Sequence, residues 1–229
     1  MTLIEDYGLE SPTKTLLLLI LSIEDYSHTK KMDKLHIQKI IKFFEELCQS
    51  KKIDFSNFKL GGVSYKLEEN KQELIEYGFI ELTSGYYNLT NEGDKAANLL
   101  KQTFDEEKYE KLVYAKQSLN DLPSDELMYF MYKTIPTTQE HSTEFKRLER
   151  KNEKLVSVLF SKRKIDVATA SRWLGISKNE FIKKIPKKTL SVETQKALIE
   201  GYQQGADEDL SIAKEFEWVD YELDQQCNM

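Results

Sequence analysis

A basic stretch in the second half of the chain, from Lys162 to Lys188, constrains the fold more than any other feature. Asp166 is expected to cap a short helix over Val167–Leu174, because its carboxylate can accept a hydrogen bond from an otherwise unpaired backbone N–H. Gly175 follows this helix at the position where helices commonly end in the left-handed conformation, which glycine adopts at little cost. The sequence therefore predicts a helix that ends at a defined residue.

A second helix is expected to begin after Ser177, because Glu180 stands three residues later and completes a capping box. Ser171, four residues before Gly175, is small enough to let two helices cross closely. The pattern is typical of a helix-turn-helix. An ordinary pair of short helices with a solvated basic face would show the same local signals. The residues expected to face inward are Ile176, Phe181 and Ile185.

The charge distribution favours the helix-turn-helix interpretation. From Thr143 to Lys188 there are 14 Lys and Arg against 5 Asp and Glu, a net charge of +9, whereas the whole chain is −6, so the remainder carries −15. Basic charge gathered on one segment of an acidic chain indicates a surface for phosphate. Lys178, Asn179 and Lys183 are expected to face the bases. The predicted DNA-binding residues are Arg172, Ser177, Lys178, Asn179, Lys183, Lys184 and Lys187.

The same stretch resembles the small helix-turn-helix antitoxins of prokaryotic toxin–antitoxin pairs. The residues that carry the resemblance are Ser161-Lys-Arg-Lys-Ile165, Ala170-Ser171, Leu174-Gly175-Ile176-Ser177 and Glu180-Phe181-Ile182. Ser171 stands where that pattern has alanine. The resemblance implies that the segment binds operator DNA, with the chain paired as a homodimer on a two-fold site.

The first 140 residues read as helices with one hairpin. Met1–Thr13 is expected to be a loose arm, and Gly61-Gly62 to break the chain. A hairpin is expected over Phe79–Leu82 and Tyr86–Leu89, because Ser84-Gly85 between them is a turn signal. The helices are expected at Thr15–Asp25, Asp33–Cys48, Ser64–Tyr77, Thr90 or Asn91–Leu100, Phe104–Ser118 and Ser124–Lys133, the last capped by Ser124.

Helices followed by a two-stranded wing and another helix describe a winged-helix domain. Four stretches also resemble the YwgA-like group and, more distantly, the Panacea (SocA-like) antitoxin domain, whose members are held to serve toxin neutralisation and not catalysis. Gly62-Val-Ser-Tyr65 departs from the Gly-Pro-Tyr-Ser of those families. The stretches are Met32–Ile40, Gly62–Tyr65, Leu74–Ile80 and Tyr87–Gly93.

The predicted fold is mainly α, with a winged-helix-like N-terminal domain that carries a small β-hairpin, then a helix-turn-helix and a helical C-terminal tail. The expected domains are residues 1–140, 141–190 and 191–229. The boundary is placed at Gln139–His141, where polar residues precede the switch to basic charge. A long helix is expected over Glu144–Phe160, and its apolar stripe fits either the core or a dimer contact.

The C-terminal tail is acidic and aromatic. From Glu193 to Asp224 there are 10 acids against Lys196 and Lys214, a net charge of −8. The run Gly201–Glu215 resembles the toxin-wrapping tails of MazE-type antitoxins, which implies a cognate protein toxin such as a MazF-like ribonuclease. The tail would equally suit packing on the chain's own body or over its own basic segment. The predicted toxin-binding residues are Leu198, Tyr202, Leu210, Ile212, Phe216 and Trp218.

Composition argues against several other classes of protein. Two cysteines and three histidines provide no zinc spacing or disulfide framework, so no metal, cofactor or catalytic residue is expected. His36 is expected to be a partly buried helix residue. The apolar run Leu16–Leu21 is too short to span a bilayer, and no membrane partner or signal peptide is expected. A cytoplasmic location fits these features.

The sequence thus favours a non-enzymatic, antitoxin-like DNA-binding regulator that neutralises a toxin through its tail and represses its own operon. Two alternatives stay open. One is a winged-helix transcription regulator without a toxin partner, and the other is an adaptor that does not bind DNA.

Overall fold

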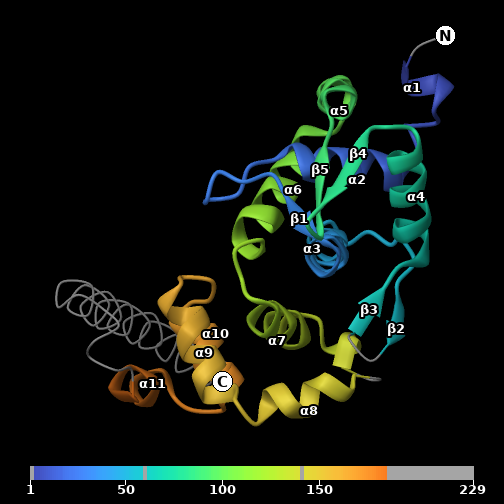
Figure 1. Cartoon of the computed structure of the whole chain (residues 1–229). Helices are drawn as coiled ribbons and strands as arrows, with labels where there is room; N and C mark the ends of the chain where they lie inside the picture. Colours follow the sequence, from blue (N-terminus) through green and yellow to red (C-terminus); the bar gives the residue numbers. More distant parts are fainter. Residues whose placement is uncertain (1–2, 59–60, 140–141, 185–229) are drawn as a thin grey trace, which may run out of the picture. The chain divides into compact units, whose positions relative to one another are not determined.

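The computed structural model describes residues 3–58, 61–139 and 142–184. Residues 1–175 belong to one compact unit, and the chain from Ile176 onward to a second, of which α11 is described (Figure 1). The elements are α1 (Leu3–Asp6), α2 (Pro12–Ser22), β1 (Met32–Asp33), α3 (Lys34–Leu47), β2 (Ser56–Phe58), β3 (Gly61–Val63), α4 (Tyr65–Glu76), β4 (Ile80–Thr83), β5 (Tyr86–Leu89), α5 (Asn91–Thr103), α6 (Glu106–Leu119), α7 (Ser124–Thr134), the 3₁₀ turn η1 (Pro136–Gln139), α8 (Thr143–Glu149), α9 (Asn152–Ser161), α10 (Val167–Leu174) and α11 (Lys178–Lys184).

The first unit is mainly helical, as expected, with a small antiparallel sheet. Its three strands lie in the order β1-β5-β4, and Met32 pairs with Tyr87 while Ile80 pairs with Leu89. The order of elements from α2 through β1, α3 and α4 to the β4–β5 hairpin is the connectivity of a winged-helix domain. A second hairpin, β2–β3, is inserted between α3 and α4.

The predicted β4–β5 hairpin is confirmed. Ser84 and Gly85 both have positive φ, at 53° and 83°, which is the backbone of a type I′ turn and matches the twist of paired strands. The helix that follows lies close to the sheet, because a Cβ at Gly93 would stand 2.0 Å from the carbonyl oxygen of Phe79. Glycine at this position is therefore a packing requirement of α5.

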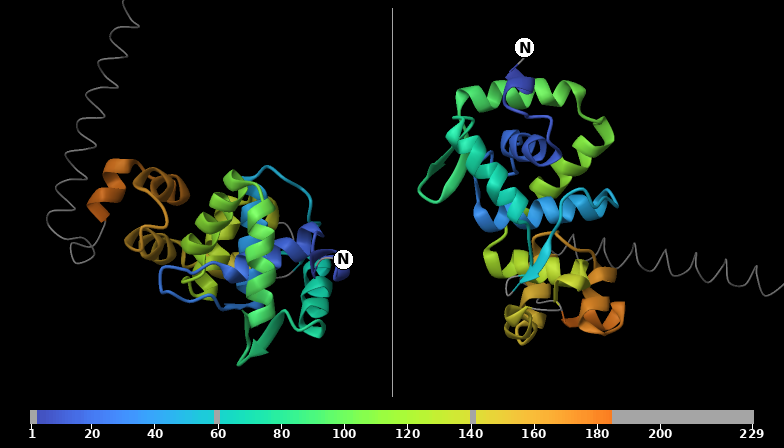
Figure 2. Two further views of the ribbon diagram at one scale, coloured as in Figure 1. Left: turned by 90° about the horizontal axis from the view of Figure 1, so that it is seen from above. Right: turned by 90° about the vertical axis from the view of Figure 1, so that its right-hand side faces the viewer.

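The predicted core helix is α2, which starts at Pro12 and whose leucine and isoleucine side chains are all buried. Leu17 through Leu21 are fully buried. The helix contacts α4, α5 and α6, and the right-hand view of Figure 2 shows it enclosed by them. Burial on all sides explains why its sequence is apolar without helical periodicity.

Several expectations for the N-terminal part were wrong. Met1–Thr13 is not a loose arm where it is described, since it contains α1 and Leu9 is fully buried. Gly61 and Gly62 do not break the chain but form β3, where Gly61 has φ of +77° and a Cβ would meet Tyr132 at 3.2 Å. Ser124 does not cap α7, because the helical hydrogen bonds already begin at the carbonyl of Pro123.

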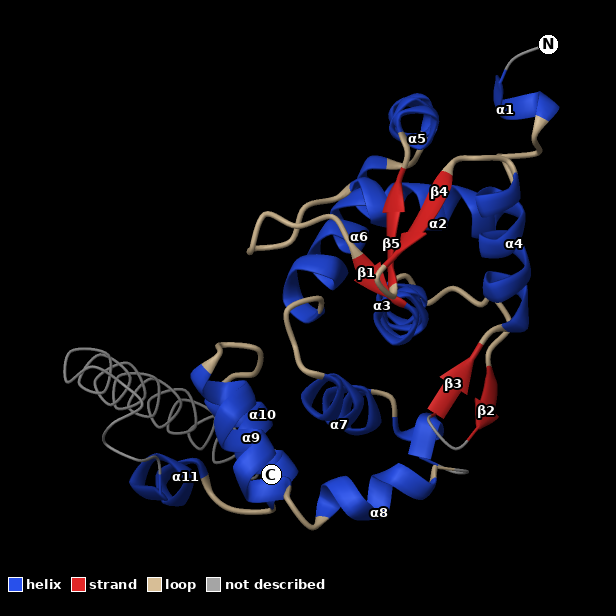
Figure 3. Cartoon of the chain, viewed as in Figure 1, coloured by secondary structure: helices blue, strands red, loops and turns tan. Residues whose placement is uncertain are grey.

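The helix expected over Glu144–Phe160 is two helices, α8 and α9. They meet at a turn in which the N–H of Lys151 donates to the carbonyl of Leu148 at 2.8 Å. The bend lets both helices contact α7, and Figure 3 shows α8 and α9 following one another past it. The apolar stripe is core, because Leu148, Val156 and Leu159 are fully buried. Residues on both sides of position 140 thus lie in one unit.

Candidate nucleic-acid interface

The first predicted recognition element, α10, forms with the expected ends. The Asp166 carboxylate accepts the N–H of Thr169 at 2.7 Å, and Gly175 ends the helix in the left-handed conformation with φ of +67°. The N–H of Thr169 and the charge of Arg172 hold the pKa of Asp166 below its usual value. Ser171 is buried, and its hydroxyl donates to the carbonyl of Val167 at 2.6 Å.

An aromatic contact that the sequence analysis missed holds α10 on α7. The half-buried ring of Trp173 meets the rings of Tyr129 and Phe130 edge to face, with centroids 6.1 Å and 6.0 Å apart. Edge-to-face pairs contribute about 1 kcal/mol beyond the area that they bury. The sequence signal that could have predicted this contact is a lone tryptophan inside a short basic segment, since a large apolar ring there needs a surface to pack on. Because Trp173 packs inward, its neighbour Arg172 is free to be exposed.

The second element, α11, is seven residues long and begins as expected. The hydroxyl oxygen of Ser177 accepts the N–H of Glu180 at 3.1 Å, so the cap half of the capping box is formed. The carboxylate of Glu180 instead pairs with Lys184 at 3.3 Å. Phe181 is buried as expected. The exposed residues include Lys178, Asn179, Lys183 and Lys184.

Ion pairs within the first unit account for part of the basic surplus seen in the sequence. They connect the α8–α10 segment to the acidic residues that precede and open α7. The pKa of Asp125 lies below its usual value because Arg147 donates to its carboxylate. The pairs are Arg147–Asp125 at 2.5 Å, Lys151–Asp125 at 3.5 Å, Lys162–Glu126 at 2.7 Å and Lys164–Asp121 at 2.7 Å.

Other cations of this segment are exposed and form no ion pair with any described residue. Arg172 and Lys183 belong to the predicted set. Lys146, Arg150 and Lys154 were missed, although their four-residue spacing is typical of one helical face. These exposed cations of the described segment, for which no ion pair is found, are Lys146, Arg150, Lys154, Arg163, Arg172 and Lys183. They form the unpaired cation set.

The helix that would read DNA in a winged-helix domain, α4, has the opposite surface charge. Glu69 and Glu76 are exposed, Glu73 is half-buried, and the exposed cation is Lys66, which lies 3.7 Å from Glu69. The second lysine, Lys71, is buried against Glu68 at 2.9 Å. This surface would repel phosphate.

Two buried ionisable groups of the first unit, His36 and Lys116, have structural partners. The two ring nitrogens of His36 lie 2.9 Å from the Asp33 carboxylate and 2.9 Å from the carbonyl of Leu122. Burial opposes protonation, but the hydrogen bond and charge of Asp33 outweigh it and raise the pKa of His36. His36 is thus a buried helix residue, as expected. Lys116 is fully buried and donates to the carbonyls of Ile20 at 2.8 Å and Lys30 at 2.6 Å.

The remaining predicted binding residues lie outside the described part of the chain. They are Lys187, Leu198, Tyr202, Leu210, Ile212, Phe216 and Trp218.

Within the described ranges, no three His, Cys, Asp or Glu side chains gather in a way that could hold a metal ion. Nor does any helix of those ranges have the length and apolar character needed to cross a membrane.

In the comparisons with known proteins, no protein-family model and no curated protein matches the chain. The fold therefore defines the class to which the protein can be assigned. It is a mainly helical protein with a winged-helix-like N-terminal region and an exposed basic segment that follows it.

Proposed function

We propose that the chain is an antitoxin-like regulator that binds operator DNA through its basic segment. The observation that carries the proposal is the unpaired cation set, together with the exposed Lys178, Asn179 and Lys184 of α11. The members of the unpaired cation set can neutralise DNA phosphates without first breaking an ion pair. Lys178, Asn179 and Lys183 would face the bases, and Arg172, Lys184 and Lys187 the phosphates. A homodimer would present the segment twice, on a two-fold operator.

The fold alone does not decide whether DNA would bind the basic segment or α4, because α4 stands at the position of the DNA-recognition helix of a winged-helix domain. The charges of the two surfaces favour the basic segment. Glu69 and Glu76 on α4 are exposed and oppose the approach of phosphate, although Glu73 is paired with Lys14 at 2.8 Å, whereas Arg172 and Lys183 attract it. The winged-helix-like region would then be a scaffold or docking module, in a chain without catalytic activity.

The second half of the proposal is that the tail neutralises a cognate toxin of the MazF-like ribonuclease kind, and that the pair represses its own operon in the cytoplasm. Its support is the sequence resemblance of Gly201–Glu215 to MazE-type tails and the net charge of −8 from Glu193 to Asp224. Acidic charge with aromatic anchors suits a basic groove, since charge steers association while buried rings hold the complex.

DNA binding is tested by fluorescence anisotropy of the full-length chain with duplex DNA from upstream of its own reading frame. Affinity should fall steeply with salt, with a slope of about −4 in a double-logarithmic plot if about four phosphates are contacted. A random duplex of equal length is the control for sequence preference. A flat salt dependence would contradict phosphate contact and leave the adaptor alternative standing.

Toxin binding is tested by copurification from the native host with the full-length chain and with a chain truncated after Lys188. A small basic protein lost on truncation is expected. Replacing Tyr202, Leu210 and Phe216 together by Ala should abolish that capture and spare DNA binding. If the triple substitution abolished DNA binding instead, the tail and the basic segment would not have the separate functions proposed. If truncation left the set of copurified proteins unchanged, a regulator without a toxin would be favoured.

The adaptor alternative has one specific observation in its favour. The ends of α4 expose Tyr65 and Tyr77 beside the acidic side chains, and the wing exposes Leu82. Exposed aromatic residues on a helix face are typical of protein contacts. If the salt-dependence experiment shows no DNA binding, this face is the one to examine for a protein partner.

A further inference from the structure

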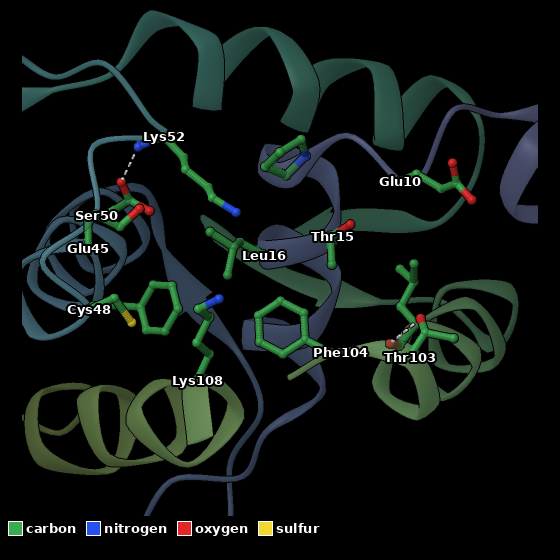
Figure 4. A pocket seen from close by; sticks show the side chains of 13 residues that line it. Glu10, Thr15, Leu16, Glu45, Cys48, Ser50, Lys52, Thr103, Phe104 and Lys108 are labelled. Atoms are coloured by element: carbon green, nitrogen blue, oxygen red, sulfur yellow. Dashed lines mark hydrogen bonds between the residues drawn. The ribbon is translucent and has the colours of Figure 1, made fainter. Parts of the chain in front are cut away.

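The first unit contains a cavity of about 260 Å³ that none of the predicted functions uses. It lies among α2, α3, α5 and α6, beside the segment that follows α3 (Figure 4). Its volume is close to the lower end of small-molecule pockets, which run from roughly 300 to 1,000 Å³. All of its lining residues lie in the described part of the first unit.

The floor of the cavity is apolar. Leu16, Phe44 and Leu100 are each less than 5 % exposed, and the half-buried ring of Phe104 completes the wall. The four side chains come from or directly follow three helices that pack around the same core, so the floor is fixed by the fold. An apolar floor of this kind binds the hydrocarbon part of a ligand.

The neutral and acidic polar groups of the lining are largely satisfied within the chain. The Thr15 hydroxyl donates to the carbonyl of Leu9 at 2.8 Å, and that of Thr103 to the carbonyl of Leu100 at 3.2 Å. One carboxylate oxygen of Glu45 accepts the backbone N–H groups of Lys52 and Ile53 at 2.8 Å and 3.2 Å. These groups therefore offer little to a ligand.

Two lysines provide the remaining polar groups of interest. Lys52 and Lys108 are exposed, and no described carboxylate forms an ion pair with either ammonium group. Figure 4 shows both side chains extending toward Leu16 from different sides of the cavity, while the carboxylate of Glu10 points away. Two ammonium groups over an apolar floor favour an anion with a hydrocarbon body, because hydrogen bonds between charged groups are the stronger kind.

We propose that this cavity binds a small apolar carboxylate, with Lys52 and Lys108 holding the carboxylate group and the floor at Leu16 and Phe104 holding the hydrocarbon chain. The proposal does not depend on DNA binding, because neither lysine belongs to the basic segment. It gives the winged-helix-like region a ligand site of its own.

The probe for the test is octanoate, with 1-octanol as the neutral compound of equal chain length, titrated calorimetrically into the full-length protein. Octanoate should bind several-fold tighter than octanol. Lys52→Gln and Lys108→Gln should each weaken octanoate binding about three-fold and leave octanol unaffected, as expected for exposed charge pairs. Both lysines are exposed, so neither variant should alter folding.

The matched control is Lys51→Gln, since Lys51 is exposed and adjacent in sequence but does not line the cavity. It should bind octanoate as the unmodified chain does. Ring proton shifts of Phe104 in the NMR spectrum should follow the octanoate titration and so place the ligand. The proposal is overturned if octanol binds as tightly as octanoate, if the two cavity variants behave like Lys51→Gln, or if the Phe104 signals do not move.

Discussion

The winged-helix-like region and the basic segment use their cations in opposite ways. Before position 140, Lys39, Lys71 and Lys116 are almost completely buried, each at most 3 % exposed. In the segment from residue 143 to 184, Arg172 and Lys183 lie in solvent without an ion pair in the described chain. Lysines of the first region thus include ones that hold the fold together, whereas the basic segment includes cations that are available to a partner.

Two of these buried lysines, Lys39 and Lys116, connect elements that are distant in sequence. Lys39 on α3 donates to the carbonyl of Gly62 on β3 at 3.0 Å, and Lys116 on α6 donates to Ile20 and Lys30. Burial lowers the pKa of Lys39 to about 8 and that of Lys116 to about 7. Basic residues can therefore be counted as a surface for DNA only after their burial and pairing are known.

The largest expected effect is that of Lys116→Met on stability. The substitution keeps the aliphatic volume but leaves the carbonyls of Ile20 and Lys30 without their donor, which should lower the free energy of unfolding by about 3 kcal/mol. Urea unfolding followed by circular dichroism measures it. Lys111→Met on the same helix is the control, because Lys111 pairs with Glu107 at the surface and should be neutral. Equal losses for the two variants would remove the distinction between buried and surface lysines.

The same lysine predicts a pH dependence. Burial lowers the pKa of Lys116 from the ordinary 10.5 to about 7 in the folded chain, although the charge of Asp25 opposes this. Between pH 7 and pH 10.5, Lys116 is mostly neutral in the folded chain and protonated in the unfolded chain, so unfolding takes up one proton. The stability of the unmodified chain should therefore rise with pH relative to Lys116→Met, by about 1.4 kcal/mol per pH unit, and the difference should be constant below pH 7. A difference independent of pH up to 9.5 would contradict a neutral Lys116.

In the basic segment, Arg172→Glu and Lys183→Glu should each weaken DNA binding about ten-fold. Arg172→Glu, at a proposed phosphate contact, should also reduce the salt slope by about one, whereas Lys183→Glu, at a proposed base contact, should also relax the sequence preference. The matched control is Lys66→Glu on α4, an exposed lysine of the winged-helix-like region, which should leave the affinity unchanged. If Lys66→Glu is the damaging change, α4 reads the DNA in spite of its acids, and the basic segment loses its proposed role.

Local signals in the sequence were sufficient for much of this structure. Cap residues place helix starts because the hydrogen bond that they make spans only three residues, as Asp33, Thr90 and Asp166 do here. Ser84-Gly85 places the hairpin in the same way. For this reason both ends of α10 and the start of α11 were predicted correctly. Arg172 and Lys183 are exposed, and their roles in DNA binding stay predictions.

Contacts between residues that are distant in sequence could not be predicted from local signals. Lys164 meets Asp121 across 43 positions, and the buried Lys116 meets Ile20 across 96. Nothing local distinguishes Lys116 from the partly exposed Lys111 five residues earlier. The strand β3 was missed because two glycines read as a break, although their lack of side chains is what lets the chain approach Tyr132. Charge counting overestimated the free basic surface for the same reason.

The smallest expected effect compares the ends of two helices, one in each region. Gly78 follows α4 with φ of +76° and Gly175 follows α10 with φ of +67°, and a Cβ added at either would meet no described atom within 4 Å. Alanine at each position should cost about 1 kcal/mol, because only the left-handed backbone opposes it. Thermal unfolding of Gly78→Ala and Gly175→Ala should therefore show equal shifts if α10 unfolds together with the rest of the first unit. A shift for Gly78→Ala alone would mean that α10 melts separately, and that the basic segment is held only by local contacts such as Trp173 on α7.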